Sequence, residues 1–248
     1  MLDDEKLLAK RLSELSERAY SRGTHEYSDF LSLSGQDVLL KTKLSCEAEL
    51  IGGYDTAERK IACFFPKDCY YEETPPISYI SITPLSQKFA DKLTHRDFLG
   101  SLTGLGIRRE VLGDIIISEN IGYLVCKEEI AEYIEQTLIK VKHTDVKCKI
   151  VDSLPKVSVE LPEPSFAVVS SERIDSIVAA VFCISRSDSQ DLFAHDKVFI
   201  SGRLAQSLTA SPKAGDIISV RGFGRFVYEG IERETKKGRL RVKIRIFK

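Results

Sequence analysis

The stretch Val111–Glu129, VLGDIIISENIGYLVCKEE, predicts a β-hairpin in the middle of the chain. Two apolar runs flank the pair Glu119-Asn120, and a short polar connection between apolar runs is typical of a hairpin turn. A helix is expected on each side of the hairpin, over THRDFLGSLTGLG (94–106) and over IAEYIEQTLIKV (130–141), because apolar residues recur there at helical spacing. The hairpin therefore lies between two helices.

Two further strands complete this segment. ISYISITPL (77–85) precedes the first helix, and VKCKIVD (146–152) follows the second. The resulting order, βαββαβ, is that of the ferredoxin-like split β-α-β fold. Sheets of this kind can bind RNA by stacking bases on aromatic side chains of the open face. Tyr79 and Tyr123 are the candidates here, and because two tyrosines are fewer than the usual aromatic set, this mode of binding is left open.

The preceding segment predicts a smaller α+β domain. A helix is expected over residues 3–22, whose apolar residues form a stripe, and another over DVLLKTKL (37–44). CEAELIGGYDTAERKIACFFP (46–66) predicts two strands around a Gly-Gly turn. Thr74-Pro75-Pro76 marks a boundary, which assigns residues 1–74 to an N-terminal domain and residues 75–152 to the ferredoxin-like domain.

A proline-containing stretch, residues 153–171, is expected to be an extended linker to a third domain at residues 172–248. ERIDSIVAAVF (172–182) and SRSDSQDLFAHD (185–196) predict two short helices, the second with Ser185 as its N-cap. Strands are expected over KVFISGRLA (197–205), with a turn at Ser201-Gly202, and over RLRVKIRIFK (239–248). SPKAGDIISVRGFGRF (211–226) is expected to be a turn followed by a strand. The predicted fold class is therefore α+β with three small domains.

The formal net charge of −1 hides an uneven distribution. Residues 171–248 carry 15 Lys and Arg against 9 Asp and Glu, whereas residues 1–170 carry 21 against 28. Such a split suggests that the C-terminal end meets an anionic partner, and a solvated basic tail is the alternative. In the last strand, the alternation of side chains places four positive charges on one face, at Arg239, Arg241, Lys243 and Arg245. Such a row of like charges is easiest to explain if an anion covers it.

Basic residues of the third domain are expected to contact RNA phosphates. Arg173 and Arg186 lie near the N-termini of the two predicted helices, where free N–H groups favour phosphate. Contacts of this kind supply affinity and salt dependence with little sequence discrimination. The candidate RNA-binding residues are Arg173, Ser185, Arg186, Lys197, Arg203, Arg221, Arg225, Arg239 and Arg241.

The motif VRGFGRF (220–226) places two glycines between arginines in a predicted strand. Glycine weakens a strand, so we interpret Gly222 and Gly224 as positions where an RNA backbone approaches while Phe223 or Phe226 stacks on a base. The alternative is a β-bulge that turns the strand, with the aromatic rings in the core. Both interpretations hold if Phe226 is in the core and the arginines face outward.

Other features favour neither catalysis nor a metal or cofactor site. The six cysteines include no Cys-x-x-Cys pair, which favours buried free thiols over zinc. HRD (95–97) lacks the motifs that accompany it in kinases, and helix initiation is the expected role of residues 94–97. No apolar run approaches the length of a membrane span and no signal peptide is evident, so we expect a cytoplasmic protein.

Two smaller features keep alternative interpretations. His195, between the second helix and the next strand of the third domain, either caps carbonyl groups or touches phosphate. Arg108, Arg109 and Asp114 lie in a polar loop that contacts either RNA or the neighbouring domain.

The third domain resembles the alpha-L RNA-binding motif of small-subunit ribosomal protein S-four, of some pseudouridine synthases and of a heat-shock RNA-binding protein. Ser201-Gly202 stands where the motif has Asn-Gly, and Asp188 and Asp191 dilute the positive charge of the second helix. The resemblance implies an alpha-L fold that binds structured RNA. It rests on Arg173-Ile174-Asp175, Ser185-Arg186-Ser187, Leu192, Lys197–Gly202 and Ala214–Ile217.

Over its whole length the chain is similar to the YlmH family, on HRDFLGSLTGLGIRREVLGDI (95–115) and ISVRGFGRF (218–226). This resemblance implies a non-catalytic protein that binds rRNA or tRNA on the ribosome, in the cytoplasm or in the plastid stroma of a photosynthetic host. Relatives of the terminal module act on large subunits that carry a stalled peptidyl-tRNA, and DNA is not an expected partner. Two alternatives stay open: a protein-binding adaptor in cell division or organelle assembly, and an accessory of an RNA-modifying enzyme.

Overall fold

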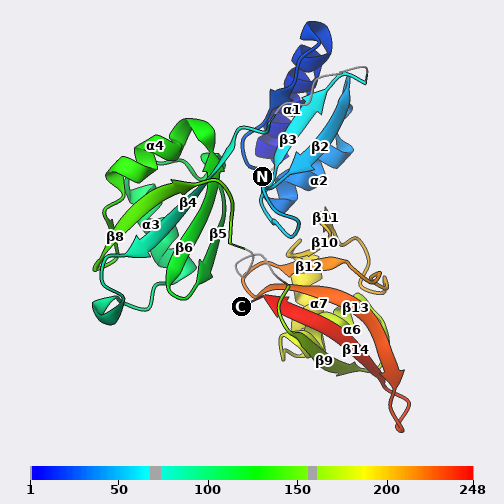
Figure 1. The fold of residues 1–248 in the computed structure, drawn as a ribbon. Coiled ribbons are helices and arrows are strands. Elements are labelled where there is room, and N and C mark those ends of the chain that lie inside the picture. The colour runs from blue at the N-terminus through cyan, green and yellow to red at the C-terminus, as the bar shows by residue number, and fades with distance from the viewer. Residues whose placement is uncertain (1, 68–73, 156–160, 248) are drawn as a thin grey trace. The chain divides into compact units, whose positions relative to one another are not determined.

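The computed structural model describes residues 2–67, 74–155 and 161–247 of the chain (Figure 1). The chain divides into two compact units, residues 1–160 (unit 1) and residues 161–248 (unit 2). Helices and antiparallel sheets are present in both, so the predicted α+β class is confirmed. The N-terminal and ferredoxin-like segments both lie in unit 1, and a domain boundary between them stays a prediction.

Unit 1 begins with two helices and a three-stranded antiparallel sheet of order β1-β3-β2. The stripe of α1 packs against α2 and β3, where Leu12, Ala19 and Phe64 are buried. The predicted helix over residues 3–22 and the strand pair within 46–66 are confirmed. The elements are α1 (Leu2–Arg22), β1 (Glu26–Tyr27), α2 (Leu33–Lys41), β2 (Glu47–Ile51) and β3 (Ile61–Phe65).

The helix α2 begins earlier than the sequence predicts. The apolar residues predict a helix over residues 37–44, whereas α2 spans Leu33–Lys41. Ser32 is the N-cap, because its Oγ accepts a hydrogen bond from the N–H of Gly35. Gln36 is buried, and its side chain donates to the carbonyl oxygens of Leu31 and Glu58. The first turn is polar and carries no apolar periodicity, so the pattern misses it.

The remainder of unit 1 is an antiparallel sheet of order β5-β6-β4-β8-β7 with two helices. The predicted order βαββαβ is confirmed as β4-α3-β5-β6-α4-β8. Short 3₁₀ turns span Gln87–Phe89 and Arg109–Val111. The main elements are β4 (Ile77–Pro84), α3 (His95–Gly104), β5 (Leu112–Ser118), β6 (Ile121–Lys127), α4 (Glu128–Thr137), β7 (Lys140–Val141) and β8 (Thr144–Val151).

The end of α4 differs from the sequence prediction. A helix is expected through residue 141, but α4 ends at Thr137, and Lys140–Val141 pairs with β8 as the short strand β7. Lys142 has a left-handed backbone, with a φ of 55°, and this turns the chain back on itself. Of the apolar residues that continue the helical pattern, Leu138 and Val141 are buried in the same core, whereas Ile139 is exposed.

The hairpin predicted from Val111–Glu129 is confirmed. Glu119 and Asn120 have φ values of 49° and 63°, and positive φ at both positions is what a two-residue type I′ turn requires. The side chain of Asn120 accepts a hydrogen bond from the N–H of Leu93 at 2.8 Å and donates one to the carbonyl of Asp91 at 2.9 Å. The turn is thereby tied to the segment that leads into α3.

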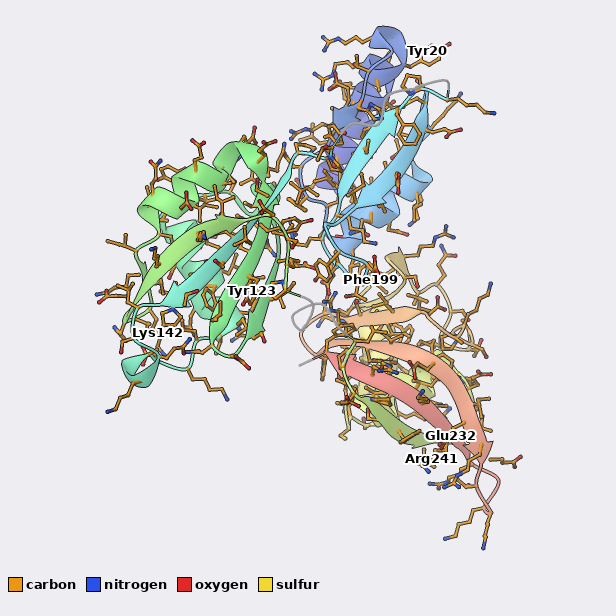
Figure 2. All side chains as sticks on the ribbon, in the orientation of Figure 1. Tyr20, Tyr123, Lys142, Phe199, Glu232 and Arg241 are labelled. Atoms are coloured by element: carbon orange, nitrogen blue, oxygen red, sulfur yellow. The ribbon has the colours of Figure 1, made fainter. Side chains whose placement is uncertain are left out.

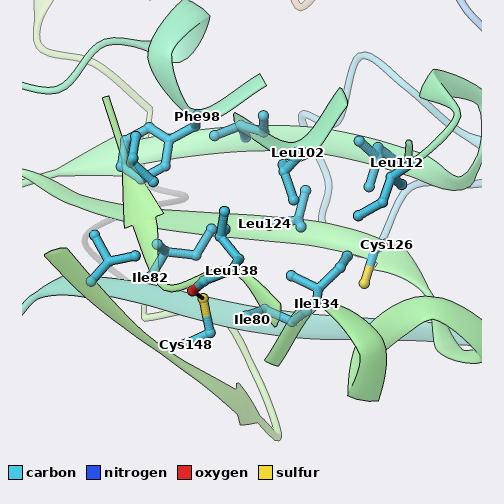
Figure 3. Packing of buried hydrophobic residues seen from close by; sticks show 14 of the residues in the cluster. Ile80, Ile82, Phe98, Leu102, Leu112, Leu124, Cys126, Ile134, Leu138 and Cys148 are labelled. Carbon is cyan, nitrogen blue, oxygen red and sulfur yellow. Dashed lines mark hydrogen bonds between the residues drawn. The ribbon is translucent and has the colours of Figure 1, made fainter. Parts of the chain in front are cut away.

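The core of this sheet lies beneath α3 and α4. Figure 3 shows Phe98 and Leu102 of α3 and Ile134 of α4 close to Ile80 and Ile82 of β4. At the start of α3, the N–H of Thr94 donates to the carboxylate of Asp97 at 2.8 Å in a capping box. The expected role of residues 94–97 in helix initiation is therefore confirmed.

Gly122 of β6 lies against the ring of Phe98, and an added Cβ would come within 2.5 Å of a ring carbon. Because Phe98 is fully buried, we expect Gly122→Ala to destabilise unit 1 by about 1–3 kcal/mol through overpacking. Native-state hydrogen exchange of α3 and β6 peptides measures the change. The matched control is Gly100→Ala within α3, where the new methyl meets no atom within 4 Å. It should leave stability unchanged or raise it, and equal effects of the two changes would contradict the packing argument.

Unit 2 is a six-stranded antiparallel sheet of order β11-β10-β12-β13-β14-β9 with two helices. The core contains Ile177 and Val178 of α6, Leu192 of α7, and Phe226 and Ile244 of the sheet. The elements are β9 (Pro164–Val169), α6 (Ile174–Val181), α7 (Arg186–Ala194), β10 (Val198–Ile200), β11 (Arg203–Leu204), β12 (Ile217–Val220), β13 (Gly224–Glu234) and β14 (Leu240–Phe247).

Part of the expected linker is a strand. Residues 153–171 are predicted to run between domains, but Pro164–Val169 pairs with β14 as β9, an edge strand of unit 2. Ala167 and Val169 are buried while Phe166 and Val168 are exposed, which is the alternation of a strand with one covered face. The prolines made this segment look like a linker, although a proline such as Pro164 is tolerated at the first position of an edge strand. Residues 156–160 of the expected linker lie outside the described residues.

The motif VRGFGRF is a hairpin turn rather than one strand. β12 ends at Val220, residues 221–223 form a turn, and β13 begins at Gly224. Gly222 has a φ of +86°, a conformation that side chains other than glycine rarely adopt, so the turn itself explains this glycine. The predicted single strand is therefore wrong. The register shifts of β13 lie further along, between Tyr228 and Gly230 and between Ile231 and Arg233.

The cysteines within the described residues are free thiols. Cys63, Cys126 and Cys148 are buried as expected, whereas Cys183 is exposed, and Cys69 lies outside the described residues. Burial raises the pKa of Cys126 and of Cys148 to about 12. In the described part of the chain, no three His, Cys, Asp or Glu side chains are grouped to hold a metal ion, and no helix could cross a membrane.

Candidate RNA interface

The N-termini of α6 and α7 meet around one buried carboxylate. Asp175 is 0% exposed, and its two oxygens accept hydrogen bonds from Nε and Nη2 of Arg173 at 3.0 and 2.8 Å. Arg186 donates to Oγ of Ser176 at 3.0 Å, and Oγ of Ser189 donates to the backbone carbonyl of Asp175 at 2.8 Å. Two of the predicted RNA-binding arginines are therefore brought together by the packing of α6 on α7.

The pKa of Asp175 reflects this arrangement. Burial alone would raise the pKa, but the hydrogen bonds from Arg173 and from the N–H of Ser176, with the charges of Arg173 and Arg186, hold it below its ordinary value. The carboxylate therefore stays ionised at neutral pH and neutralises part of the positive charge. The side chain of Arg173 is 35% exposed and contacts the buried Asp175, whereas Arg186 is exposed.

Ser185 is the N-cap of α7, as the sequence predicts. Its Oγ accepts a hydrogen bond from the N–H of Asp188 at 3.1 Å, and the carboxylate of Asp188 accepts one from the N–H of Ser185 at 3.3 Å. This is a capping box. The acidic residue that dilutes the positive charge of α7 is thus explained by helix initiation.

The turn between β12 and β13 lies beside the connection of α6 to α7. The exposed ring of Phe223 is 5.6 Å from that of Phe182, which follows α6 directly. The N–H of Arg221 donates to the carbonyl of Lys197 at 2.9 Å, and the guanidinium of Arg221 lies 5.0 Å from the centre of the Phe199 ring. Arg221 and Lys197 are therefore neighbours, and Lys197 lies just beyond the C-terminal end of α7.

Phe223 and Phe226 have different surroundings. Phe226 is 0% exposed in the core, whereas Phe223 is 47% exposed on the turn. The sequence interpretation combined a core Phe226 with outward-facing arginines. The burial of Phe226 and the exposure of Arg221 agree with it, whereas Arg225 is half-buried. A base could reach the ring of Phe223 but not that of Phe226.

The remaining predicted residues are more widely spaced. Arg203 lies on β11, exposed, next to the β10–β11 turn, and Arg225 lies over the ring of Phe247 at 4.4 Å. Arg239 and Arg241 lie at the other end of the sheet, near the tip of the β13–β14 hairpin (Figure 1). The structure therefore brings Arg173 and Arg186 together beside Ser185 at the start of α7. It separately places Arg221 beside Lys197, and it brings neither Arg239 nor Arg241 to these residues.

The row of positive charges on β14 is paired with glutamates of the neighbouring strand β13. The carboxylate of Glu229 accepts from Nε of Arg245 at 2.5 Å and pairs with Nζ of Lys243 at 2.7 Å. Glu232 pairs with Arg241 at 3.0 Å, and Arg241 also lies 3.9 Å from the ring centre of Phe166 (Figure 2). The anion expected from the sequence is thus supplied by β13. Acidic residues on the preceding strand were the signal that could have revealed this.

Hydrogen bonds from Lys243 and Arg245 hold the pKa of Glu229 below its ordinary value. A depressed pKa adds stability that is present above the unfolded value, about 4.3, and is lost as the pH falls through the folded value. We expect Glu229→Gln to cost unit 2 about 1–2 kcal/mol at neutral pH, and the difference from wild type to shrink below about pH 4. Hydrogen exchange of β14 peptides at both pH values measures it. Glu234→Gln, an exposed neighbour, should be neutral at either pH.

His195 has a capping geometry. Its Nδ1 lies 2.7 Å from the backbone carbonyl of Asp191, and His195 is the C-cap of α7. Of the two roles left open by the sequence, carbonyl capping is the one with a contact. Phosphate contact by its other ring nitrogen is not required to explain the residue.

The polar loop of unit 1 contacts the N-terminal segment. The carboxylate of Asp114 accepts hydrogen bonds from the Tyr54 hydroxyl at 2.7 Å and from the N–H groups of Glu58 and Arg59. Arg59 in turn donates to the carbonyls of Phe30, Arg109 and Leu112. Burial, followed by the like charge of Arg59, lowers the pKa of Arg109 to about 10. Sequence analysis missed Arg59, because its partners lie far away along the chain.

The two tyrosines of the ferredoxin-like sheet differ in accessibility. Tyr79 donates its hydroxyl to the carbonyl of Gly53 at 2.9 Å and packs against a cluster that includes Phe30 and Val125. Tyr123 lies on the same face of the sheet and is only half-buried (Figure 2). Tyr79 is therefore not a platform for bases, and Tyr123 keeps that role open.

Comparison with known proteins identifies relatives over most of the chain. The family model described as "Putative RNA-binding domain in YlmH" matches residues 77–154. The protein named ribosome-associated protein quality control protein P2, from Bacillus subtilis (strain 168), is 32% identical over 224 residues, which are 87% of this chain and 84% of the relative. A solved structure titled cell division protein ylmH, from Streptococcus pneumoniae, covers 60% of this chain and 91% of its own, with 19% identity and a TM-score of 0.49. On the extent of the match to the Bacillus protein and the family model within it, the chain belongs to the YlmH family.

Proposed function

We propose that the chain is a non-catalytic protein that binds structured rRNA or tRNA on the ribosome, with the large subunit as its platform. The name of the Bacillus relative places that protein in ribosome-associated quality control, and we extend this setting to the present chain. Unit 2 makes the main contact with RNA. The protein acts in the cytoplasm or in the stroma of a plastid.

The observation that carries the proposal is a set of exposed cations that form no ion pair within the described residues. Within the described residues, Arg186, Lys197 and Arg203 are exposed and have no carboxylate at ion-pair distance. On β14, by contrast, Arg241, Lys243 and Arg245 are each paired with glutamate. Exposed cations that are held on a folded surface without an ion-pair partner suit phosphate, whose binding releases counterions.

The surroundings of these cations suit RNA rather than a flat anionic protein. The α7 N-terminus, with Ser185 and Arg186, offers backbone N–H groups to phosphate. The exposed ring of Phe223 stands on the adjacent turn, where an unpaired base can stack. Arg225 and Arg173 add charge at the margins, and Arg239 and Arg241 extend it only if a long RNA reaches the hairpin tip.

Sedimentation of a lysate through sucrose gradients tests the proposal. We expect the protein to move with large subunits at low salt and to return to the top of the gradient at high salt, because phosphate contacts weaken with ionic strength. Nuclease treatment that releases the protein from its complexes would support an RNA contact. A protein that stays at the top at low salt, or keeps a protein partner after nuclease treatment, would favour the adaptor alternative.

A further inference from the structure

The sheet formed by β5, β6, β4 and β8 has one face that no helix of the described part of unit 1 covers. Ile80 and Ile82 of β4 and Leu124 of β6 belong to the core beneath α3 and α4. Residues between them point to the other face, because side chains alternate along a strand. The register aligns Tyr123 with Ser81, and Ser81 with Lys149, so these three side chains form one row across the open face.

One end of this open face is closed and the other is accessible. Tyr79 and Val125 are covered by the cluster that contains Phe30 and Ile61, and the hydroxyl of Tyr79 is bonded to Gly53. Tyr123, two residues from Val125 on the same strand and face, is half-buried with its ring beyond that cover. The accessible part of the face therefore begins at the ring of Tyr123, next to the part that the Phe30 and Ile61 cluster covers.

The accessible part is also basic, within a part of the chain that is acidic. Lys147 and Lys149 are exposed on β8 and, among the described residues, have no carboxylate at ion-pair distance. Residues 140–149 contain four lysines and one aspartate, Asp145, which pairs with Lys140 at 3.4 Å. This basic patch is not evident from the charge of residues 1–170 as a whole, which contain 28 acidic and 21 basic residues.

We propose that this face is a second RNA contact, separate from unit 2, that takes a single-stranded segment. An unpaired base stacks on Tyr123, and the backbone phosphates run along Lys147 and Lys149. Residues two apart on a strand are separated by about 7 Å, which suits successive phosphates of an extended strand. The hydroxyl of Ser81 lies between the ring and the lysines, and it donates to the Lys149 carbonyl at 3.3 Å.

RNA fits this face better than a peptide does. A peptide added to a sheet pairs with an exposed edge, whereas Tyr123 and Ser81 lie on the two central strands, β6 and β4. An aromatic ring flanked by uncompensated lysines is the arrangement that binds single-stranded nucleic acid with little sequence preference. The family model that matches residues 77–154 is also described as an RNA-binding domain.

The test uses the full chain with unit 2 disabled, so that the two contacts are distinguished. In a background of Arg186, Lys197, Arg203 and Arg221→Ala, binding of a fluorescent oligouridylate is followed by anisotropy. We expect Tyr123→Ala to weaken binding about 5- to 150-fold, the range for one lost stacked base. Lys147→Ala with Lys149→Ala should weaken it and flatten its salt dependence. An abasic oligonucleotide of equal length should lose affinity with the lysine change but not with Tyr123→Ala.

Matched controls lie on other surfaces of unit 1. Tyr133→Ala removes an exposed tyrosine from α4, and Lys6→Ala with Lys10→Ala removes two exposed lysines from α1. Both should bind as the background does. Equal affinity of the Tyr123 and Tyr133 variants, or no oligouridylate binding by the background protein, would overturn this proposal. Either result would leave the unit 2 proposal standing, since that is tested with unit 1 intact.

Discussion

Replacing Asp175 with alanine is expected to destabilise unit 2 by about 3 kcal/mol, the lower end of the range for removing one partner of a buried ion pair. The carboxylate is fully buried and accepts hydrogen bonds from Arg173 and from the N–H of Ser176. Without it, Arg173 keeps its charge in a half-buried place, and the first turn of α6 loses an acceptor. The lower end applies because Arg173 is 35% exposed and water can reach it.

Hydrogen–deuterium exchange of peptides from α6 and α7 measures this effect. Because the chain consists of two compact units, a single unfolding curve would mix their transitions. A loss of about 3 kcal/mol corresponds to exchange that is roughly 150-fold faster in the most protected amides. Asp191→Ala, an exposed acidic residue of α7, should change it little. Equal protection of the two variants would show that the Asp175 cluster does not hold α6 and α7 together.

The elements that sequence analysis predicts best are those defined by residues close in the chain. The turn at Glu119-Asn120 and the N-cap at Ser185 depend on a few neighbouring residues, and both are confirmed. The order βαββαβ follows from alternating patterns of strand and helix in sequence. Where the periodicity is interrupted, as at the polar start of α2, the boundary moves by a few residues.

Three other misses have a different cause, which is pairing between distant residues. β9 is a strand only because β14 lies beside it, and Pro164 pairs in register with Arg245. The basic row of β14 looks unpaired along its own strand, while its anions, Glu229 and Glu232, lie on β13. Neither relation is visible from the pattern of one strand taken alone. The same holds for Arg59, whose hydrogen-bond acceptors are 29 to 53 residues away.

The candidate interface was predictable in its residue types and not in its grouping. The charge split suggested an anionic partner for the C-terminal end, and the nine candidates, which stay a prediction, came also from predicted helix N-termini and the VRGFGRF motif. The structure separates them into cations without acidic partners near α7 and β10, such as Arg186 and Lys197, and cations that are already paired, such as Arg241. Side-chain pairing across strands, which sets this division, depends on strand register.

Replacing Arg186, Lys197, Arg203 and Arg221 together with alanine is expected to weaken binding to a structured RNA roughly 100-fold, which is about 0.7 kcal/mol for each charge. If all four contact phosphate, the dependence of log affinity on log salt should also become shallower, by about 3 units of slope. Fluorescence anisotropy with a labelled stem-loop RNA across a salt series measures both quantities. A change in slope reports lost phosphate contacts, which a damaged fold would not produce in a graded way.

The decisive control removes the same number of charges elsewhere in unit 2. Arg233, Lys236, Lys237 and Arg239 are exposed around the tip of the β13–β14 hairpin, so their replacement by alanine gives the same change in net charge. If unit 2 binds RNA near α7, the tip variant should lose less than about tenfold in affinity and keep most of its salt slope, because only long-range attraction is reduced. Equal losses in the two variants would mean that net charge, rather than the grouped residues, governs binding. A larger loss at the tip would move the interface to the hairpin and make Arg239 its centre.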